Sequence, residues 1–97
     1  MKKISHITIN TGHVAQYEDE VVNTICENMQ KAYEKEGIKV EILVDILKNA
    51  DSMERLVNVG NAVLVEKAGK AHCMDIKEEI ELLQRQDIKI LGGIIVA

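Results

Sequence analysis

The stretch AVLVEKAGKAHCMDIKEEIELLQRQDIKILGGIIV, residues 62–96, decides the fold class of this chain. It opens with an apolar run, Ala62 to Val65, which is the pattern of a central strand covered on both faces. A helix follows from about His72 to Gln86, with apolar residues at helical spacing. Ile88 to Val96 predicts a last strand that is apolar on both faces except at Lys89. Strands and helices in alternation, joined by short loops, predict parallel strands with right-handed crossovers.

The first half of the chain continues the same alternation. The elements predicted there are a strand over 4–10, an amphipathic helix over 14–36, a strand over 39–47 and a short helix that begins at Asp51 or Ser52 and closes at Gly60. We therefore predict one α/β domain over residues 1–97, in the order β-α-β-α-β-α-β. Its sheet is expected to be open, four-stranded and mainly parallel, with the helices packed on it.

Two finer expectations concern the first strand and the first helix. One face of the 4–10 strand is polar and carries His6, Thr8 and Asn10. A polar strand face usually lies in water, so we interpret this strand as an edge of the sheet, and the wall of a site is the alternative. The apolar stripe expected for the 14–36 helix consists of Tyr17, Val21, Ile25 and Met29, flanked by Val22, Cys26 and Tyr33.

Composition limits the classes of function. Sixteen acidic residues against twelve basic ones give a net charge of −4, which argues against a nucleic-acid binder with a basic face. No window is apolar enough for a membrane span, and the first residues do not form a signal peptide. The two cysteines stand at unrelated spacings, so we expect reduced thiols in a cytoplasmic protein. A chain of 97 residues with two aromatic residues builds a modest core, so we expect a homo-oligomer.

The junction of the first strand and helix, Thr11-Gly12-His13, is the place where a nucleotide-binding domain carries its phosphate loop. A single glycine stands here, and no lysine follows before Lys31. Acidic residues at 18–20 would also repel an anion. The junction is therefore not a nucleotide triphosphate loop. A simple turn is the leading interpretation, and a modest ligand site around Thr11 and His13 is the alternative.

Metal binding and thiol catalysis are weakly indicated. The residues of metal-ligand type are His6, His13, His72, Cys26, Cys73 and Asp75, and their spacings match no closed zinc site. Cys26 lies on an apolar helix face, where cysteine acts as a small hydrophobic residue. Cys73 lies beside His72 near a helix start, where thiols are activated, but it also begins the apolar stripe completed by Ile76, Ile80 and Leu83. We predict no metal, no cofactor and no catalytic residue.

Residues 52–97 resemble the C-terminal part of the P-loop tyrosine-autokinase-like proteins of capsule and exopolysaccharide biosynthesis, which have a MinD/ParA-type fold. The resemblance is carried by the apolar strand 62–65, the turn Lys67-Ala68-Gly69-Lys70, a charged helix with Glu-Leu-Leu, and the final strand Ile-Leu-Gly-Gly-Ile-Ile at 90–95. In that family these elements support the nucleotide site without making the main phosphate contacts.

The first half departs from that family. Residues 39–45 resemble its strand that ends in a magnesium-associated aspartate, which puts Asp45 at that position. The phosphate loop and the tyrosine-rich tail are missing. Without a loop lysine and serine, an aspartate cannot organise nucleotide and magnesium, so Asp45 is expected to be a loop or cap residue. The resemblance implies a relative without catalysis.

We therefore predict a non-catalytic α/β binding or regulatory module that acts through self-association or a protein partner. The resemblance implies a link to cell-surface polysaccharide biosynthesis. Two other interpretations stay open: a small enzyme or phosphocarrier that uses His13 or Cys73, and an inhibitor protein encoded by a phage or mobile element. The candidate ligand-binding residues are Thr11, Gly12, His13, Asp45 and His72.

Overall fold

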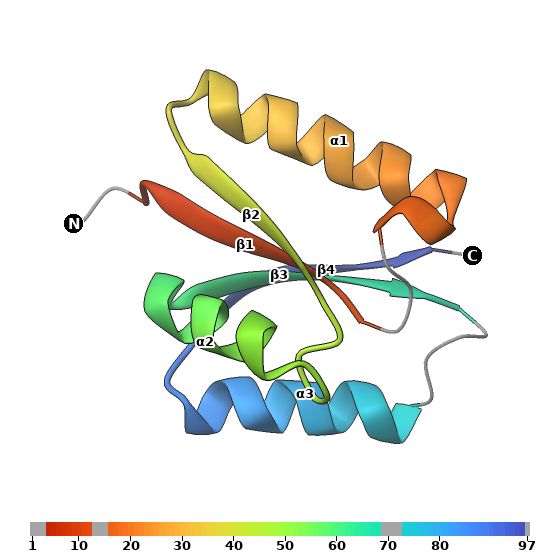
Figure 1. Cartoon of the computed structure of the whole chain (residues 1–97), viewed down its shortest axis with the longest axis vertical. Helices are drawn as coiled ribbons and strands as arrows, with labels where there is room; N and C mark the ends of the chain where they lie inside the picture. Colours follow the sequence, from red (N-terminus) through yellow and green to blue (C-terminus); the bar gives the residue numbers. More distant parts are fainter. Residues whose placement is uncertain (1–3, 13–15, 69–72, 97) are drawn as a thin grey trace.

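A four-stranded parallel sheet forms the centre of the molecule in the computed structural model, which describes residues 4–12, 16–68 and 73–96 (Figure 1). The strands are β1 (His6–Thr11), β2 (Lys39–Val44), β3 (Asn61–Lys67) and β4 (Lys89–Val96). The helices are a short 3₁₀ turn η1 (Gln16–Glu18), α1 (Glu20–Lys35), α2 (Ala50–Val59) and α3 (Cys73–Arg85). Every strand pair is parallel, so the predicted fold class and element order are confirmed.

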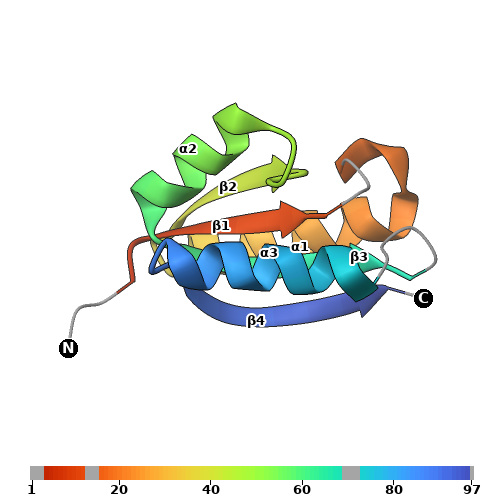
Figure 2. The ribbon, with the colours of Figure 1, turned by 90° about the horizontal axis from the view of Figure 1, so that it is seen from below.

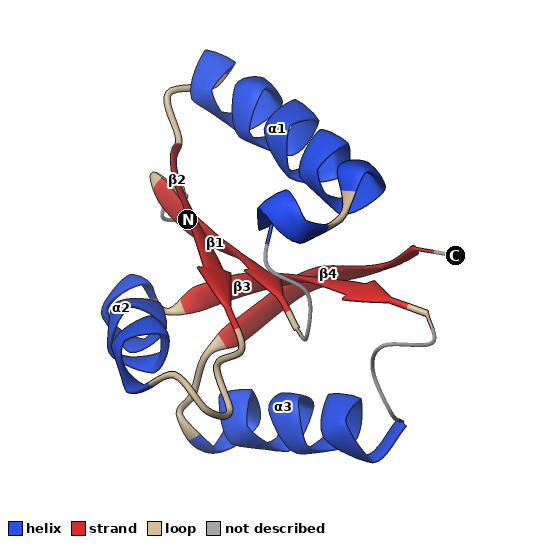
Figure 3. Cartoon of the chain, turned by 45° about the vertical axis from the view of Figure 1, so that its right-hand side comes forward, coloured by secondary structure: helices blue, strands red, loops and turns tan. Residues whose placement is uncertain are grey.

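The helices cover the sheet on both sides. The strand order is β2-β1-β3-β4, with α1 on one face and α2 and α3 on the other (Figure 3). Two clusters of buried side chains form the core. The cluster beneath α1 is built on Ile7, Ile9, Val22, Cys26, Val65 and Val96. The cluster beneath α2 and α3 is built on Leu43, Ile46, Leu56, Ala62, Leu64, Leu83 and Ile88.

The first helix begins later than the sequence predicted. The Asp19 side chain accepts hydrogen bonds from the backbone N–H groups of Val21 (2.9 Å) and Val22 (3.1 Å) and so caps α1. The inward stripe is also rotated: Val22 and Cys26 are buried, whereas Tyr17 is 82% exposed and Val21 50% exposed. The predicted stripe was therefore wrong at its first two positions, because the cap at Asp19 separates η1 from α1.

The second strand ends earlier than predicted, and the second helix has a different cap. Asp45 adopts a φ of +48° directly after β2, and its carbonyl accepts bonds from the N–H groups of Lys48 (3.1 Å) and Asn49 (2.8 Å). Asn49 caps α2 by accepting a bond from the Ser52 N–H at 3.2 Å, in place of the predicted Asp51 or Ser52. Gly60 ends α2 in the left-handed conformation, as predicted.

β1 is a central strand, so its interpretation as an edge was wrong. It pairs with β2 on one side and with β3 on the other. Thr8 is fully buried and Asn10 is 3% exposed. The true edges of the described sheet are β2 and β4, and Figure 2 shows β4 at the outer border beside α3.

Candidate functional site

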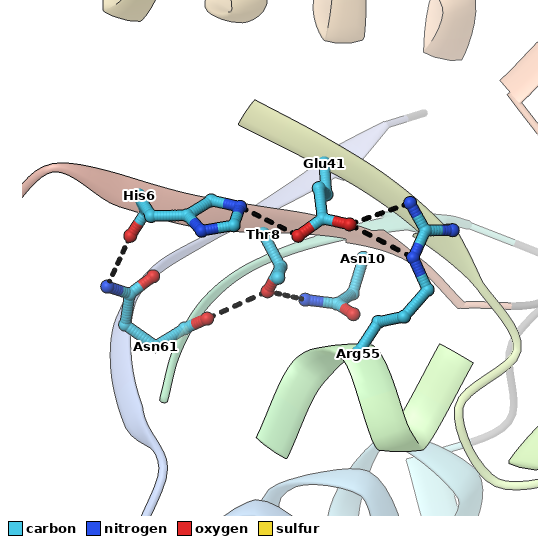
Figure 4. A network of polar contacts seen from close by, with 6 residues as sticks. All are labelled: His6, Thr8, Asn10, Glu41, Arg55 and Asn61. Carbon is cyan, nitrogen blue, oxygen red and sulfur yellow. Dashed lines mark hydrogen bonds and ion pairs between the residues drawn. The ribbon is translucent and has the colours of Figure 1, made fainter. Parts of the chain in front are cut away.

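The polar side chains of β1 fasten this strand to β3 (Figure 4). The Thr8 hydroxyl donates to the Asn61 carbonyl at 2.7 Å, and the Asn61 amide donates to the His6 carbonyl at 2.9 Å. The Asn10 amide donates to the Thr8 hydroxyl at 3.0 Å and to the Val63 carbonyl at 3.4 Å. Buried polar groups need such partners, and here most of them are backbone carbonyls of the neighbouring strand. These side chains therefore hold the sheet together.

A second polar cluster joins β1, β2 and α2. The His6 Nε2 atom lies 2.7 Å from Glu41 Oε2, and Arg55 donates from Nε (3.0 Å) and Nη2 (2.7 Å) to Glu41 Oε1 (Figure 4). Burial of the Glu41 carboxyl opposes ionisation, but Arg55 and His6 outweigh it and hold its pKa below the usual value. The Arg55 side chain is 46% exposed, so we expect the cluster to contribute as little to the free energy of unfolding as a surface ion pair does.

Three predicted site residues come together where β1 and β2 end. The Thr11 hydroxyl donates to the Leu43 carbonyl at 3.4 Å, and the Asp45 N–H donates to the Thr11 carbonyl at 3.4 Å. Gly12 donates its N–H to the Val65 carbonyl at 3.2 Å. These contacts are those of a sheet end and a turn. His13 and His72, the other two predicted residues, lie outside the described part of the chain.

Glu66 lies against Gly12, on the neighbouring strand β3. A Cβ atom added at Gly12 would come within 1.9 Å of Glu66 Oε2, so the carboxylate occupies the space of a side chain at position 12. Glu66 is 3% exposed. Gly12 and Glu66 lie at the carboxyl ends of β1 and β3, whose connections leave to opposite faces, and open α/β sheets bind ligands at such switch points. A buried carboxylate here repels phosphate.

Glu79, on α3, is a second buried carboxylate, at 1% exposure. Sequence reasoning missed both glutamates, because Glu66 lies just after the apolar run 62–65 and Glu79 belongs to a helix that was described only as charged. A signal existed for Glu79, because it lies three residues after Ile76 and one before Ile80, on the inward side of the helix. Glu66 offered none, since only the approach of Gly12 makes room for it.

A salt bridge lies close to Glu66, at the next residue of β3. Lys67 Nζ lies 3.1 Å from Asp19 Oδ2 and joins the end of β3 to the start of α1. The Val22 N–H and the Lys67 ammonium hold the pKa of Asp19 below its usual value. The acidic start of α1 thus has a cation beside it, which the sequence did not predict.

Described residues on the face covered by α2 and α3 line a groove and a smaller cavity. A groove of about 370 Å³ lies between these helices and is lined by Ala50, Met53, Glu54, Val57, Asn58, Leu82 and Gln86. A smaller cavity of about 230 Å³ lies between α3 and the strands β3 and β4. Its lining is Leu64, Glu66, Ile76, Ile80, Gly93, Ile94 and Ile95. Glu66 thus lies next to Gly12 and also lines this cavity.

The predicted core role of Cys26 is confirmed. Its side chain is fully buried, and burial raises the pKa of its thiol. The side chain of Cys73 lies outside the described part of the chain. Within residues 4–12, 16–68 and 73–96, no group of three or more His, Cys, Asp or Glu side chains is arranged to hold a metal ion.

β4 is the most exposed part of the sheet. It pairs only with β3 among the described strands, and its register shifts between Ala62 and Val63, so Leu91 is an extra residue. From Gly92 to Val96 the pairing is regular. Both glycines of this segment are exposed, and Ile95 is 66% exposed.

Comparison with known proteins gives no indication of the function of this chain. The chain matches no protein-family model, no curated protein and no solved structure. Across its described residues, no helix has both the length and the apolar character needed to cross a membrane.

Proposed function

We propose that this chain is a non-catalytic binding or regulatory module that acts by self-association, through pairing of β4 with β4 of a second copy. The observation that carries the proposal is the character of this edge. After Lys89 the strand holds only apolar residues and glycine, and one side of it has no described neighbour. Protein edges of this kind are normally blunted by charge, proline or a covering element.

The regular part of β4 is complementary to itself in the antiparallel sense. With Ile94 opposite Ile94 of the second copy, each Ile95 faces a Gly93 and each Val96 faces a Gly92. Residues opposite one another then lie on the same face, because each pair is separated by an even number of residues. On each side of the central Ile94 pair, a large side chain therefore lies opposite a glycine, which favours close packing of the two strands.

The direction of pairing also follows from Lys89. In an antiparallel pair the two Lys89 side chains lie on the order of 30 Å apart, because the strand rises about 3.3 Å per residue. In a parallel pair they would lie side by side and repel. An antiparallel pair has two-fold symmetry and closes after two copies, which supports a dimer over a filament.

The non-catalytic part of the proposal is supported by the predicted site residues. Thr11, Gly12 and Asp45 are engaged in sheet-end and turn contacts. The Glu66 carboxylate lies where an incoming phosphate would have to approach Gly12. These contacts therefore favour self-association of a reduced, cytoplasmic protein over phosphoryl transfer as the function.

The resemblance of residues 52–97 adds a cellular context to the proposal. This segment includes β3, α3 and β4, so the proposed contact edge belongs to the part that resembles the capsule and exopolysaccharide autokinase-like proteins. We propose that the module serves cell-surface polysaccharide biosynthesis as a non-catalytic relative of those proteins.

Light scattering during size-exclusion chromatography tests self-association. We expect a particle of twice 10.8 kDa at high micromolar concentration. Ile95→Lys should weaken the dimer by about tenfold or more, since it introduces charge at the edge. Val57→Lys is the matched control, because Val57 is 44% exposed on α2, and it should leave the mass unchanged. A monomeric wild type, or equal effects of both substitutions, would refute the proposal.

A further inference from the structure

The cavity beneath α3 combines an apolar wall with a missing side chain. It measures about 230 Å³, and α3 contributes Ile76 and Ile80 to its lining. At the border of the sheet it is lined by Gly93, which has no side chain to fill it. Glu66 also lines the cavity, but both of its carboxylate oxygens are buried and lie against Gly12. The cavity therefore offers its occupant mainly apolar contacts.

An exposed side chain stands beside this cavity on the same face of β4. The register places Gly93 beside Leu64, and both of them line the cavity together with Ile95. Residues two apart on a strand point to the same face, so Ile95 and the open position at Gly93 are neighbours. Ile95 is 66% exposed, whereas Val96, which packs in the core beneath α1, is 5% exposed. On its α3 side the edge thus carries an uncovered isoleucine next to an unfilled space.

We propose that each cavity beneath α3 receives the Ile95 side chain of a second copy. In the proposed antiparallel pairing of β4, on which this contact depends, Ile95 of one copy lies opposite Gly93 of the other. Positions directly opposite in such a pair lie about 5 Å apart on the same face, so Ile95 borders the space that Gly93 leaves open. Two-fold symmetry makes the exchange mutual, and each dimer buries two isoleucines in two cavities.

The size of the cavity and the needs of a dimer both support this occupant. At roughly 30 Å³ per water, the cavity corresponds to about eight water molecules, and the four side-chain carbons of an isoleucine fit within it. Pairing of residues 92–96 alone covers a narrow strip about 17 Å long, at about 3.3 Å per residue. Specific interfaces bury about 1,200–2,000 Å², so apolar side chains beside the strands must add to the contact.

Nuclear Overhauser effects (NOEs) between copies test the contact directly. In a mixed sample, half of the chains carry ¹³C-labelled isoleucine methyl groups and half are unlabelled, so a filtered spectrum records only contacts between copies. We expect NOEs from the Ile95 methyl groups of one copy to those of Ile76 or Ile80 of the other. Contacts between copies at Ile94, with none from Ile95 to α3, would overturn the proposal and leave the pairing of β4 intact.

Truncation of Ile95 measures what its burial contributes. Ile95→Ala keeps the backbone hydrogen bonds of the strand and removes most of the apolar surface that enters the cavity. We expect the dimer Kd, measured by analytical ultracentrifugation, to rise about thirtyfold or more, because two side chains per dimer lose their apolar contacts. Val57→Ala is the matched control, since Val57 is 44% exposed on α2, and its Kd should stay within about threefold of the wild type.

The remaining outcomes separate this contact from self-association itself. A dimer of Ile95→Ala with a Kd within about threefold of the wild type would mean that Ile95 stays in water, which overturns the proposal alone. NOEs that join Ile80 to a different segment of the second copy would also overturn it. A monomeric wild type would refute the pairing of β4 and this contact together. The NOE experiment uses the wild-type chain, so it decides the matter by itself if Ile95→Ala does not fold.

Discussion

The central and outer strands of this sheet reverse the usual distribution of polar and apolar residues. β1 and β3 bury Thr8, Asn10 and Glu66 in the middle of the molecule. β4, at the border, exposes Ile95 and two glycines. The difference teaches that a polar residue on a strand does not mark an edge, and that an apolar residue does not mark the centre.

Each half of this reversal has its own physical reason. In the centre, neighbouring strands supply backbone carbonyls, so Thr8 and Asn10 find acceptors without water. On the outer side of β4 there is no described neighbouring strand, and an apolar edge strand lowers its free energy by pairing with a strand of another chain. The other edge, β2, differs because it carries the Glu41 and Arg55 ion pair on its face.

The largest effect on stability is expected for Gly12→Val. The new side chain would displace the buried Glu66 carboxylate, whose Oε2 atom lies within 1.9 Å of the Cβ position. Overpacking of a buried site costs about 1–3 kcal/mol, and we expect the upper end or more because a charged group is displaced. Gly92→Val is the control and should change the urea midpoint little at a protein concentration low enough for the monomer, because a Cβ atom at Gly92 has no neighbour within 4 Å in the single chain. Equal midpoints for the two variants would contradict the assigned position of Glu66.

Thr8→Val should have the next largest effect. It keeps the shape of the side chain but removes the donor to the Asn61 carbonyl and an acceptor for the Asn10 amide. Buried groups left without partners cost roughly 1–3 kcal/mol, and we expect about 2 kcal/mol from urea unfolding. Thr24→Val is the control, because Thr24 bonds the Glu20 carbonyl at an exposed position of α1. A loss no greater than that of the control would show that the polar row does not stabilise the sheet.

At low pH the protein should lose the contribution of Glu41 to its folding stability, and this loss should be smaller than that expected for Thr8→Val. Its pKa is lowered in the folded state, so the unfolded chain binds the proton more tightly and stability falls as pH falls. The contribution is complete above the ordinary glutamate pKa, near pH 4.3, and is lost as the pH falls through the folded value. We expect a difference of less than about 1 kcal/mol between wild type and Glu41→Gln at neutral pH, since Arg55 is 46% exposed.

Urea unfolding as a function of pH measures this difference directly. The two curves should converge in acid. A gap that stays constant down to the lowest pH at which the protein folds would assign the effect of Glu41→Gln to packing instead of charge.

The smallest effect on stability is expected for Ile95→Thr, measured at a protein concentration low enough for the monomer. Ile95 is 66% exposed, so the monomer should lose no more than about 0.5 kcal/mol. The same substitution at high concentration should lower the unfolding midpoint further, because it weakens the dimer. A large loss in the dilute sample would mean that Ile95 belongs to the core of one chain.

The sequence alone predicted the element order and the parallel sheet, because the apolar run at 62–65 and the period change after Asn10 are local features. It did not predict the strand order. The polar face of β1 was read as an edge, since the carbonyls of Asn61 and Val63 that satisfy it come from a strand more than fifty residues away. Local pattern cannot supply that information.

The candidate site was predicted in part. Thr11, Gly12 and Asp45 meet at the strand ends, as their positions after the first two strands implied. Glu66 and Lys67 were missed, because their roles depend on the approach of Gly12 and Asp19, which belong to other parts of the chain. The cavity beneath α3 was missed for the same reason: its lining combines side chains of three elements.

Amide hydrogen exchange at two protein concentrations tests self-association through β4 most directly. We predict that the outward-facing amides of residues 92–96 exchange more slowly as the concentration rises. The outward-facing amides of β2 should be unaffected, because that edge stays free in the proposed dimer. Exchange in β4 that does not depend on concentration, or protection that develops at β2 instead, would contradict the account.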